Sequence, residues 1–475
     1  MQSAVDAMPE STTSWKALAL LVLGSTAARA QPVASVSERR PVPLREALQL
    51  TARQGPDVAA VRARAAIARV GIERAYEAWK PDISATGTYD HTSSSAVLNT
   101  GDIALGVAQV IGPTAGFDPN DPGIRARAAA AGTINITATN SRYGTLQLSQ
   151  PLLTPEGLFL PGIASSAAEA ADRGADEARE QILLSVARTY LSLQGIEGLL
   201  AAAYDLEKVA LRREQDSRAR IAAGAAVELD LLRAQSDTAV ARSQIASLRG
   251  QQRSLLPLLE AFVGEPVAPV PAAQGSGDLL KSAPADQATQ PWEHTFSVRS
   301  AIAQVLTLKR SVTYDEFLWM PSVSAIARGN HNSNGGFSGV ETTYDLILAI
   351  SVPLYDRGAR YTRKHEDEAR LRQSLATLAS ARAQAKAAWQ GAVENLVAAQ
   401  AVLEQSEAQV RVAKRAQQQS DVSFRGGVAT SLDLTDADNR LFQAQSSAAQ
   451  ARANLDIRRA EVAAAEGRLY GDIAM

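Results

Sequence analysis

Apolar residues recur at seven-residue intervals through the C-terminal third of the chain. The segment from Gly358 to Phe424 contains no proline and carries two such rows, four positions apart. This spacing predicts a single helix of about 60 residues, on the order of 90 Å long. A second helix from Thr430 carries rows of its own, so the two helices are expected to pair as an antiparallel coiled coil. The rows are Leu371, Leu378, Ala385, Ala392 and Ala399 with Leu375, Trp389, Leu396, Leu403 and Val410, and then Leu434, Leu441, Ala448, Leu455 and Val462.

Four shorter stretches alternate between apolar and polar or small residues. Residues 83–89, 143–149, 323–328 and 343–352 each show this period of two, which predicts strands. Strands with one apolar face and one polar face suit a barrel that has lipid outside and water inside. A sheet of four strands leaves two open edges, which a membrane does not tolerate. Three copies joined edge to edge would close a barrel of twelve strands.

The same order of elements occurs twice in the chain. Ser149-Gln150-Pro151-Leu152 is matched by Ser351-Val352-Pro353-Leu354, and Leu229-Asp230-Leu231 is matched by Leu432-Asp433-Leu434. We therefore predict an internal duplication and a mixed fold that is mainly α with some β. Each repeat is expected to contain a helix, two strands and a long helix pair. The first repeat spans 31–263 and the second 292–475, with a Pro-, Gly- and Ser-rich linker at 264–291.

The first repeat carries extra residues between its two strands. Residues 91–142 are rich in asparagine, aspartate, glycine and proline, above all in the run 118–123. These residue types are typical of turns, so the segment is predicted to be a long loop.

The N-terminus has the features of a secretory signal peptide. Lys16 precedes the apolar run 17–23, and Ala28-Arg29-Ala30 provides a small-x-small cleavage site. The prediction is a signal peptide at 1–30. The apolar run is shorter than the roughly 20 residues that a membrane-spanning helix needs.

Composition excludes several classes of function. The chain has no cysteine, which rules out disulfides, thiolate metal sites and cysteine nucleophiles. Its net charge is −2, and it has no basic stripe interleaved with aromatic residues, so no nucleic-acid partner is expected. No nucleophile elbow, P-loop or zinc motif is present. We therefore predict neither an enzyme nor a cofactor or metal site.

Several short motifs, in this order and partly repeated, resemble the TolC-like outer-membrane efflux family over nearly all of the mature chain. They are Pro43–Leu48, the segment Ser351–Gly358, and the two helix-turn sequences 220–230 and 424–434. The resemblance implies a homotrimer with a shared 12-stranded transmembrane β-barrel in the outer membrane and an α-barrel of long antiparallel helices in the periplasm. It implies an exit channel of a tripartite efflux or secretion system. A periplasmic adaptor protein would then link this passive duct to an inner-membrane pump.

The resemblance also assigns roles to acidic residues at the helix turns. Asp433 and Asp436 match positions that ring the periplasmic entrance in the family, and Asp230 matches their partner position in the first repeat. Phe424 and Ala429 depart from the family, which often has a tyrosine and an arginine there, so the gate would be built differently. The alternative is that these aspartates are ordinary acids at a helix N-terminus, stabilised by the helix dipole.

The remaining candidate residues lie at the helix turns and before the strands. Trp79 and Trp319 each precede the first strand of a repeat, where membrane-interface aromatics are expected; the alternative is a core role. For the whole protein, the alternative function is a non-pore periplasmic coiled-coil scaffold. The turn residues expected to face the adaptor are Gly224, Ala225, Gly426, Gly427 and Thr430.

Overall fold

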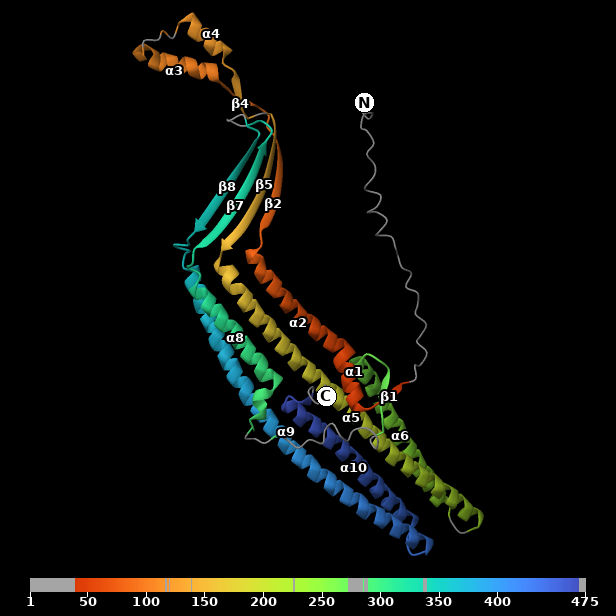
Figure 1. Cartoon of the computed structure of the whole chain (residues 1–475). Coiled ribbons are helices and arrows are strands. Elements are labelled where there is room, and N and C mark those ends of the chain that lie inside the picture. The colour runs from red at the N-terminus through yellow and green to blue at the C-terminus, as the bar shows by residue number, and fades with distance from the viewer. Residues whose placement is uncertain are drawn as a thin grey trace, which may run out of the picture.

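The molecule is elongated, with a sheet towards one end and long helices towards the other (Figure 1). The computed structural model describes residues 39–115, 118, 120–137, 139–224, 227–271, 285, 289–335 and 340–469. The predicted signal peptide 1–30 and the turn residue Ala225 lie outside these ranges. Within them, none of the helices combines the length and the apolar character needed to cross a membrane.

Four long helices form two antiparallel hairpins. In the first, α5 (Pro155–Ala222) pairs with α6 (Glu228–Val263); in the second, α9 (Ala359–Arg425) pairs with α10 (Ser431–Ala465). The predicted long helix is confirmed, since α9 has 67 residues, on the order of 100 Å. The hairpins lie side by side through α5 and α10.

Small residues let α5 and α10 approach closely. A Cβ atom added to Gly195 would lie 2.8 Å from the Cβ of Ala453, and one added to Gly198 would lie 3.1 Å from that of Ala449. The predicted heptad rows are buried along α10, where Leu434 and Leu455 belong to the apolar interior. Helix–helix packing of leucine and alanine therefore holds this half of the molecule together.

The four predicted strands form one antiparallel sheet in the order β2-β5-β7-β8. The strands β2, β5 and β7 extend beyond their predicted limits at both ends, whereas β8 both begins and ends one residue earlier than predicted. The sheet joins strands from both repeats, because β5 from the first pairs with β7 from the second. The strands are β2 (Asp82–His91), β5 (Asn140–Leu153), β7 (Ser322–Asn332) and β8 (Thr342–Ser351).

Shorter helices lead into the first strand of each repeat, two in the first repeat and one in the second. In the first repeat α1 (Leu44–Gln54) and α2 (Pro56–Ala75) precede a 3₁₀ turn, η1 (Tyr76–Trp79); in the second a 3₁₀ turn, η3 (Pro291–His294), precedes α8 (Phe296–Glu316). The helices α2, α5, α8 and α9 pack in that order below the sheet. This order matches that of the strands above them, so each strand continues into a helix of the same layer.

The predicted linker is partly structured. Its residues Val267–Pro269 form β6, which pairs in parallel with β1 (Arg40–Val42). Tyr190 of α5 holds this small sheet, since its hydroxyl donates to the Val42 carbonyl at 2.8 Å and accepts from the Val270 amide at 3.2 Å. The tyrosine is fully buried, and its hydrogen bond attaches Val270 to α5 within a segment whose composition predicted little structure.

The prediction of a loop at 91–142 was wrong in part. Two short strands, β3 (Ala96–Asn99) and β4 (Thr133–Thr137), lead to two helices, α3 (Thr100–Ala115) and α4 (Pro122–Ala130). Asp121 caps α4 by accepting a hydrogen bond from the Gly123 amide at 2.6 Å, and Pro122 occupies the first helical position. Residues that favour turns therefore start a helix here.

Candidate functional site

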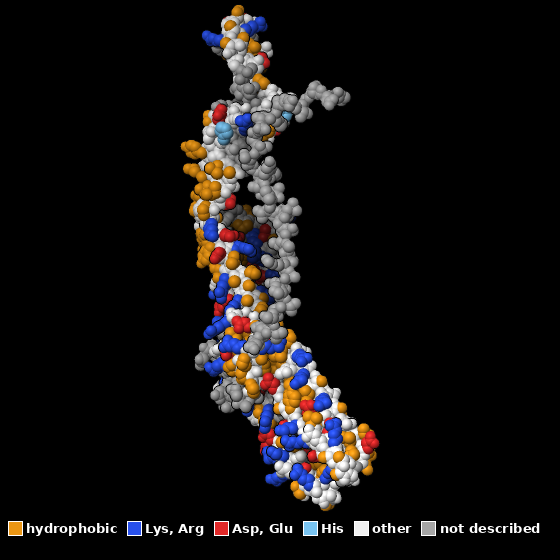
Figure 2. All heavy atoms as spheres, turned by 90° about the vertical axis from the view of Figure 1, so that its right-hand side faces the viewer, with side chains coloured by type: hydrophobic (Ala, Val, Ile, Leu, Met, Phe, Trp, Pro, Cys, Tyr) orange, Lys and Arg blue, Asp and Glu red, His pale blue; other side chains and the backbone are white. Residues whose placement is uncertain are grey.

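The two faces of the sheet differ in chemistry. Leu346, Leu348 and Ile350 of β8 share one face and are 79%, 66% and 65% exposed. Figure 2 shows hydrophobic side chains gathered along one side of the molecule over the strands. The opposite face is polar, where the Arg328 guanidinium donates to the Gln147 side chain at 3.1 and 3.2 Å. An apolar face suits lipid and a polar face suits a water-filled lumen.

Both edges of the sheet are open in the single chain. The outer strands β2 and β8 each pair with one neighbour, β5 and β7 respectively. Open backbone edges cannot face lipid, because their amide and carbonyl groups would have no partners. The sheet therefore requires further strands from other copies before it can enter a bilayer.

The two candidate interface tryptophans lie between strands and helices. The Trp79 indole donates to the Gly157 carbonyl of α5 at 2.6 Å and is partly buried. Trp319 is 45% exposed, with the Arg360 guanidinium 3.6 Å from its ring centroid and Tyr361 edge-on at 5.8 Å. Their role at a membrane interface stays a prediction.

Glycines form the turns at the tips of both hairpins. Gly224 and Gly427 adopt left-handed conformations with φ of 71° and 74°. After α9, the amide of Gly427 donates to the Phe424 carbonyl at 3.1 Å and that of Val428 to the Ser423 carbonyl at 2.9 Å. This pair of bonds is the Schellman motif, which satisfies the last carbonyls of the helix. Gly426 itself is right-handed, so only its neighbour requires glycine.

Asp433 and Thr430 cap the start of α10 together. The Asp433 carboxylate accepts from the Thr430 amide at 2.9 Å and from its hydroxyl at 2.7 Å, and the hydroxyl accepts from the Asp433 amide at 3.2 Å. These bonds from the Thr430 side chain and backbone lower the pKa of Asp433 below its ordinary value. Within one chain, Asp433 therefore acts as a helix-capping residue, with Thr430 at the N-cap position.

The other two candidate aspartates point to different partners. Asp230 of α6 accepts from the Ser431 hydroxyl of α10 at 3.1 Å, which joins the two hairpin tips. Asp436 pairs with Arg440 one turn along its own helix at 2.8 Å, and its side chain remains 57% exposed. Asp230 and Asp433 therefore lie next to the same turn, whereas Asp436 faces solvent in the single chain.

A buried ion pair that the sequence analysis missed lies one turn further in. Arg213 of α5 contacts the Asp438 carboxylate of α10, whose side chain is 6% exposed. The same guanidinium donates to the Thr435 hydroxyl at 3.0 Å and the Leu434 carbonyl at 3.1 Å. The Thr435 hydroxyl in turn donates to Asp237 of α6 at 3.1 Å. Three helices from both hairpins are thus tied together above the tips.

Burial lowers the pKa of Arg213, while the nearby carboxylates of Asp237 and Asp421 oppose that effect. The guanidinium stays charged, because arginine is not deprotonated in proteins. The sequence contains a signal for one member of this pair. Asp438 lies four positions after Leu434, on the buried side of the predicted seam, where an unpaired charge is not tolerated.

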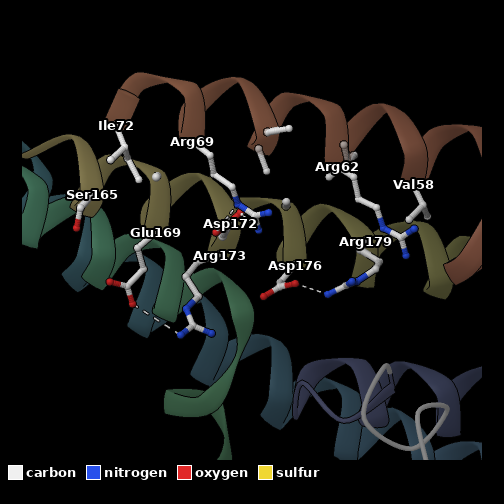
Figure 3. Close-up of a pocket in the computed structure, with 15 residues that line it drawn as sticks. Val58, Arg62, Arg69, Ile72, Ser165, Glu169, Asp172, Arg173, Asp176 and Arg179 are labelled. Atoms are coloured by element: carbon white, nitrogen blue, oxygen red, sulfur yellow. Dashed lines mark hydrogen bonds and ion pairs between the residues drawn. The ribbon is translucent and has the colours of Figure 1, made fainter. Parts of the chain in front are cut away.

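A groove of about 920 Å³, lined by both charged and apolar side chains, lies between α2 and α5 (Figure 3). Arg69 of α2 reaches Asp172 of α5 at 2.9 Å across it. The pairs within α5, such as Arg173 with Glu169 at 3.7 Å, line the same groove. The Arg69–Asp172 pair therefore joins the neighbouring helices α2 and α5.

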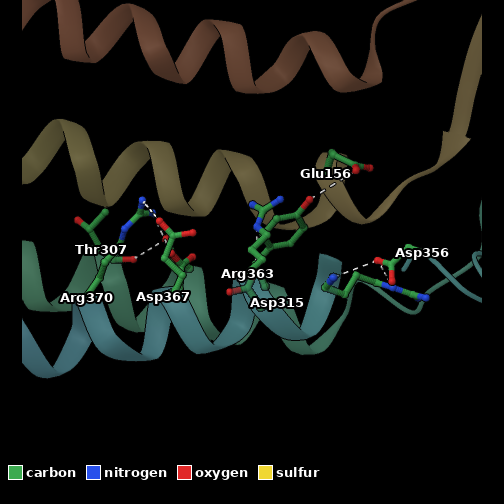
Figure 4. A network of polar contacts seen from close by, with 11 residues as sticks. Glu156, Thr307, Asp315, Asp356, Arg363, Asp367 and Arg370 are labelled. Atoms are coloured by element: carbon green, nitrogen blue, oxygen red, sulfur yellow. Dashed lines mark hydrogen bonds and ion pairs between the residues drawn. The ribbon is translucent and has the colours of Figure 1, made fainter. Parts of the chain in front are cut away.

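A second polar cluster joins α8 to α9 just below the sheet (Figure 4). Asp315 is fully buried at its side chain and pairs with Arg363 at 3.0 Å, and Arg370 pairs with Asp367 at 3.0 Å. Burial, and then the neighbouring Asp367 carboxylate, raise the pKa of Asp315 to about 6. In the described part of the chain, no group of three or more potential metal ligands comes together.

A two-faced sheet with open edges, continued by a layer of very long helices, defines a subunit of a membrane channel with a tubular extension. The chain belongs to the outer membrane efflux protein family, whose model matches residues 47–265 and 290–468. The two matched segments correspond to the two repeats. No curated protein sequence matches the chain.

Solved structures of outer-membrane channels share this fold. The outer membrane protein VceC of Vibrio cholerae has a TM-score of 0.66 at 17% identity, covering 89% of this chain and 96% of its own. CusC has a TM-score of 0.69 at 14% identity, with 90% of this chain and 92% of CusC covered. The MtrE outer membrane channel of Neisseria gonorrhoeae gives 0.68 at 15% identity, covering 91% and 93%. Family membership makes the protein an outer membrane efflux protein, and its fold is that of solved outer-membrane channels.

Proposed function

We propose that three copies of the chain form one continuous duct, and that its helical tips meet a periplasmic adaptor protein linked to an inner-membrane pump. The observation that carries this proposal is the sheet with one apolar face, one polar face and two open edges. Such a sheet closes only by joining other copies. The sequence resemblance and the family membership support a trimer and a tripartite system.

The tips of the two hairpins are the proposed entrance. Asp436 is the exposed candidate, while Asp433 and Asp230 support the turn through Thr430 and Ser431. In a trimer, Asp436 would form a ring of three carboxylates that favours cations. The glycine turns Gly224 and Gly426–Gly427, together with Thr430 and the neighbouring Ala225, form the proposed contact surface for the adaptor.

The proposed entrance is tested by single-channel conductance in planar bilayers. The variant Asp436→Asn should lower the preference for cations and leave the channel open to ions. Glu169→Gln is the matched control, because Glu169 also pairs with an arginine four residues away and is 54% exposed, but lies in α5 far from the tips. Equal selectivity in the wild type and Asp436→Asn would remove Asp436 from the entrance.

The same recordings distinguish the duct from the scaffold alternative. A non-pore scaffold gives no conductance from folded protein extracted from membranes. Trimeric mass by native mass spectrometry together with a stepwise conductance supports the duct. A monomer without conductance would contradict the proposed duct.

A further inference from the structure

The insert between β2 and β5 presents an apolar surface beyond the end of the sheet. Ile103, Val107, Val110 and Ile111 of α3 are 47%, 52%, 79% and 56% exposed. Their spacing places them on one face of the helix. The helix packs with its other side against α4, where the backbone of Gly101 lies close to the Ala128 carbonyl. A stripe of this kind on a protruding element indicates a missing partner.

Lipid is not the occupant that the geometry favours. On the outward face of the sheet, the apolar band ends with Tyr89 and Tyr344. On each of these two strands the next residue on the same face is polar: His91 is bonded to Asn140 at 2.7 Å, and Thr342 is bonded to His331 at 3.1 Å. Figure 1 shows α3 and α4 further out than these strand ends. The polar collar separates the α3 stripe from the lipid-facing band.

A second copy of the chain fits the stripe better. The insert follows β2, an edge strand that must pair with another copy, so it stands at a subunit boundary. In Figure 1 the pair of helices leans to the side on which β8, the other open edge, lies. It therefore extends towards the position of a neighbouring subunit.

The two helices also differ in a way that suits head-to-tail contact. In α3, the first turn carries Asp102, and the rest of the helix has no charge. In α4, by contrast, Arg125 and Arg127 are basic, and the exposed face contains Ala126 and Ala129. A cyclic trimer needs two different surfaces that complement each other. The apolar stripe of α3 with its acidic residue, and the face of α4 with its small and basic side chains, are two such surfaces.

We propose that α3 of one subunit packs on α4 of the next, so that three inserts form a ring of six helices over the outer mouth of the channel. The proposal rests on the proposed trimer. It assigns the first repeat's insert to an intersubunit cap, and explains why an apolar helix is placed beyond the membrane.

The test is disulfide cross-linking, for which the cysteine-free chain is a clean background. Val110→Cys is combined with Ala126→Cys in the full-length protein and oxidised in the purified particle. The control is Gln109→Cys with Ala126→Cys, because Gln109 is exposed but points away from the stripe. We expect covalent trimers from the first pair on a non-reducing gel, and monomers from the control and from both single variants.

Native mass spectrometry of the same samples separates the two proposals. A trimer whose Val110→Cys/Ala126→Cys form runs as a monomer overturns the cap and leaves the proposed function standing. A particle that is not a trimer overturns both. A fluorophore on Val110→Cys in vesicles gives an independent reading: quenching by nitroxide-labelled lipids would mean that a lipid surface covers the stripe, which also overturns the cap.

Discussion

Replacing Arg213 by methionine should loosen the contact between the two helical hairpins. The change leaves the Asp438 carboxylate, 6% exposed, without the guanidinium, and removes the hydrogen bonds to Thr435 and Leu434. Breaking one side of a buried ion pair costs about 3–5 kcal/mol. Because about 1.4 kcal/mol corresponds to a factor of ten, the population with separated tips should rise by roughly a hundredfold or more.

Limited trypsin digestion measures this population, since Arg425 and Arg220 lie at the ends of α9 and α5. When the tips reclose faster than trypsin cuts, the rate of cleavage at the tips follows the open fraction. Cleavage of Arg213→Met should therefore be about two orders of magnitude faster than that of the wild type.

The double variant Arg213→Met with Asp438→Leu is the control. It replaces the whole pair by apolar side chains, a change that is often neutral or stabilising, so slow cleavage should return. The reasoning is refuted if Arg213→Met is cut at the wild-type rate. It is also refuted if the double variant is cut as fast as the single one, because the cost would then not come from the unpaired carboxylate.

Two further predictions concern the cluster below the sheet and the tip turn. The pKa of Asp315 is about 6 in the folded state and about 4 when unfolded, so the folded state holds the extra proton and stability falls as the pH rises from about 4 to 6. Asp315→Asn should flatten the profile of melting temperature against pH between about pH 4 and 6. An unchanged slope would mean that other groups cause the pH dependence. Gly427→Ala forces a residue with a side chain to φ of 74° and should cost about 1–2 kcal/mol in urea unfolding, whereas Gly426→Ala, at φ of −77°, should change little. Equal losses from the two alanines would rule out backbone strain as the cause.

The periodic elements were predictable because their signal is local and repeated. The leucine and alanine rows predicted α9 and α10, and the alternation of Leu346, Leu348 and Ile350 predicted the two-faced sheet. Both patterns follow from the period of the secondary structure, which is about 3.6 residues in a helix and two in a strand. Because the patterns occur in both halves of the chain, the same elements are predicted for each half.

The insert was misread because turn residues outweighed a weaker helical pattern. Ile103, Val107, Val110 and Ile111 have helical spacing, but they lie in a segment rich in glycine and proline. Pro122 is typical of a turn, but a proline after an aspartate is also a common helix start. Composition alone does not separate these two uses.

The network around Arg213 could not be assigned from sequence, because its members lie on three helices. Arg213 and Leu434, for example, are 221 residues apart. Sequence position placed Asp438 on the buried side of the seam, but its partner depends on how α5 and α10 align. That alignment is set by close packing at Gly195 and Gly198, which no periodic pattern reveals.

The duplicated hairpins end in unequal turns. The helix α10 begins with the Thr430–Asp433 capping box, whereas the N-cap residue of α6, Val227, makes no side-chain cap hydrogen bond. Three copies would therefore present six tips of two alternating kinds around the entrance. An adaptor that binds these tips would meet two kinds of contact in turn, and its titration should show two classes of site in equal number, with three-fold rather than six-fold equivalence.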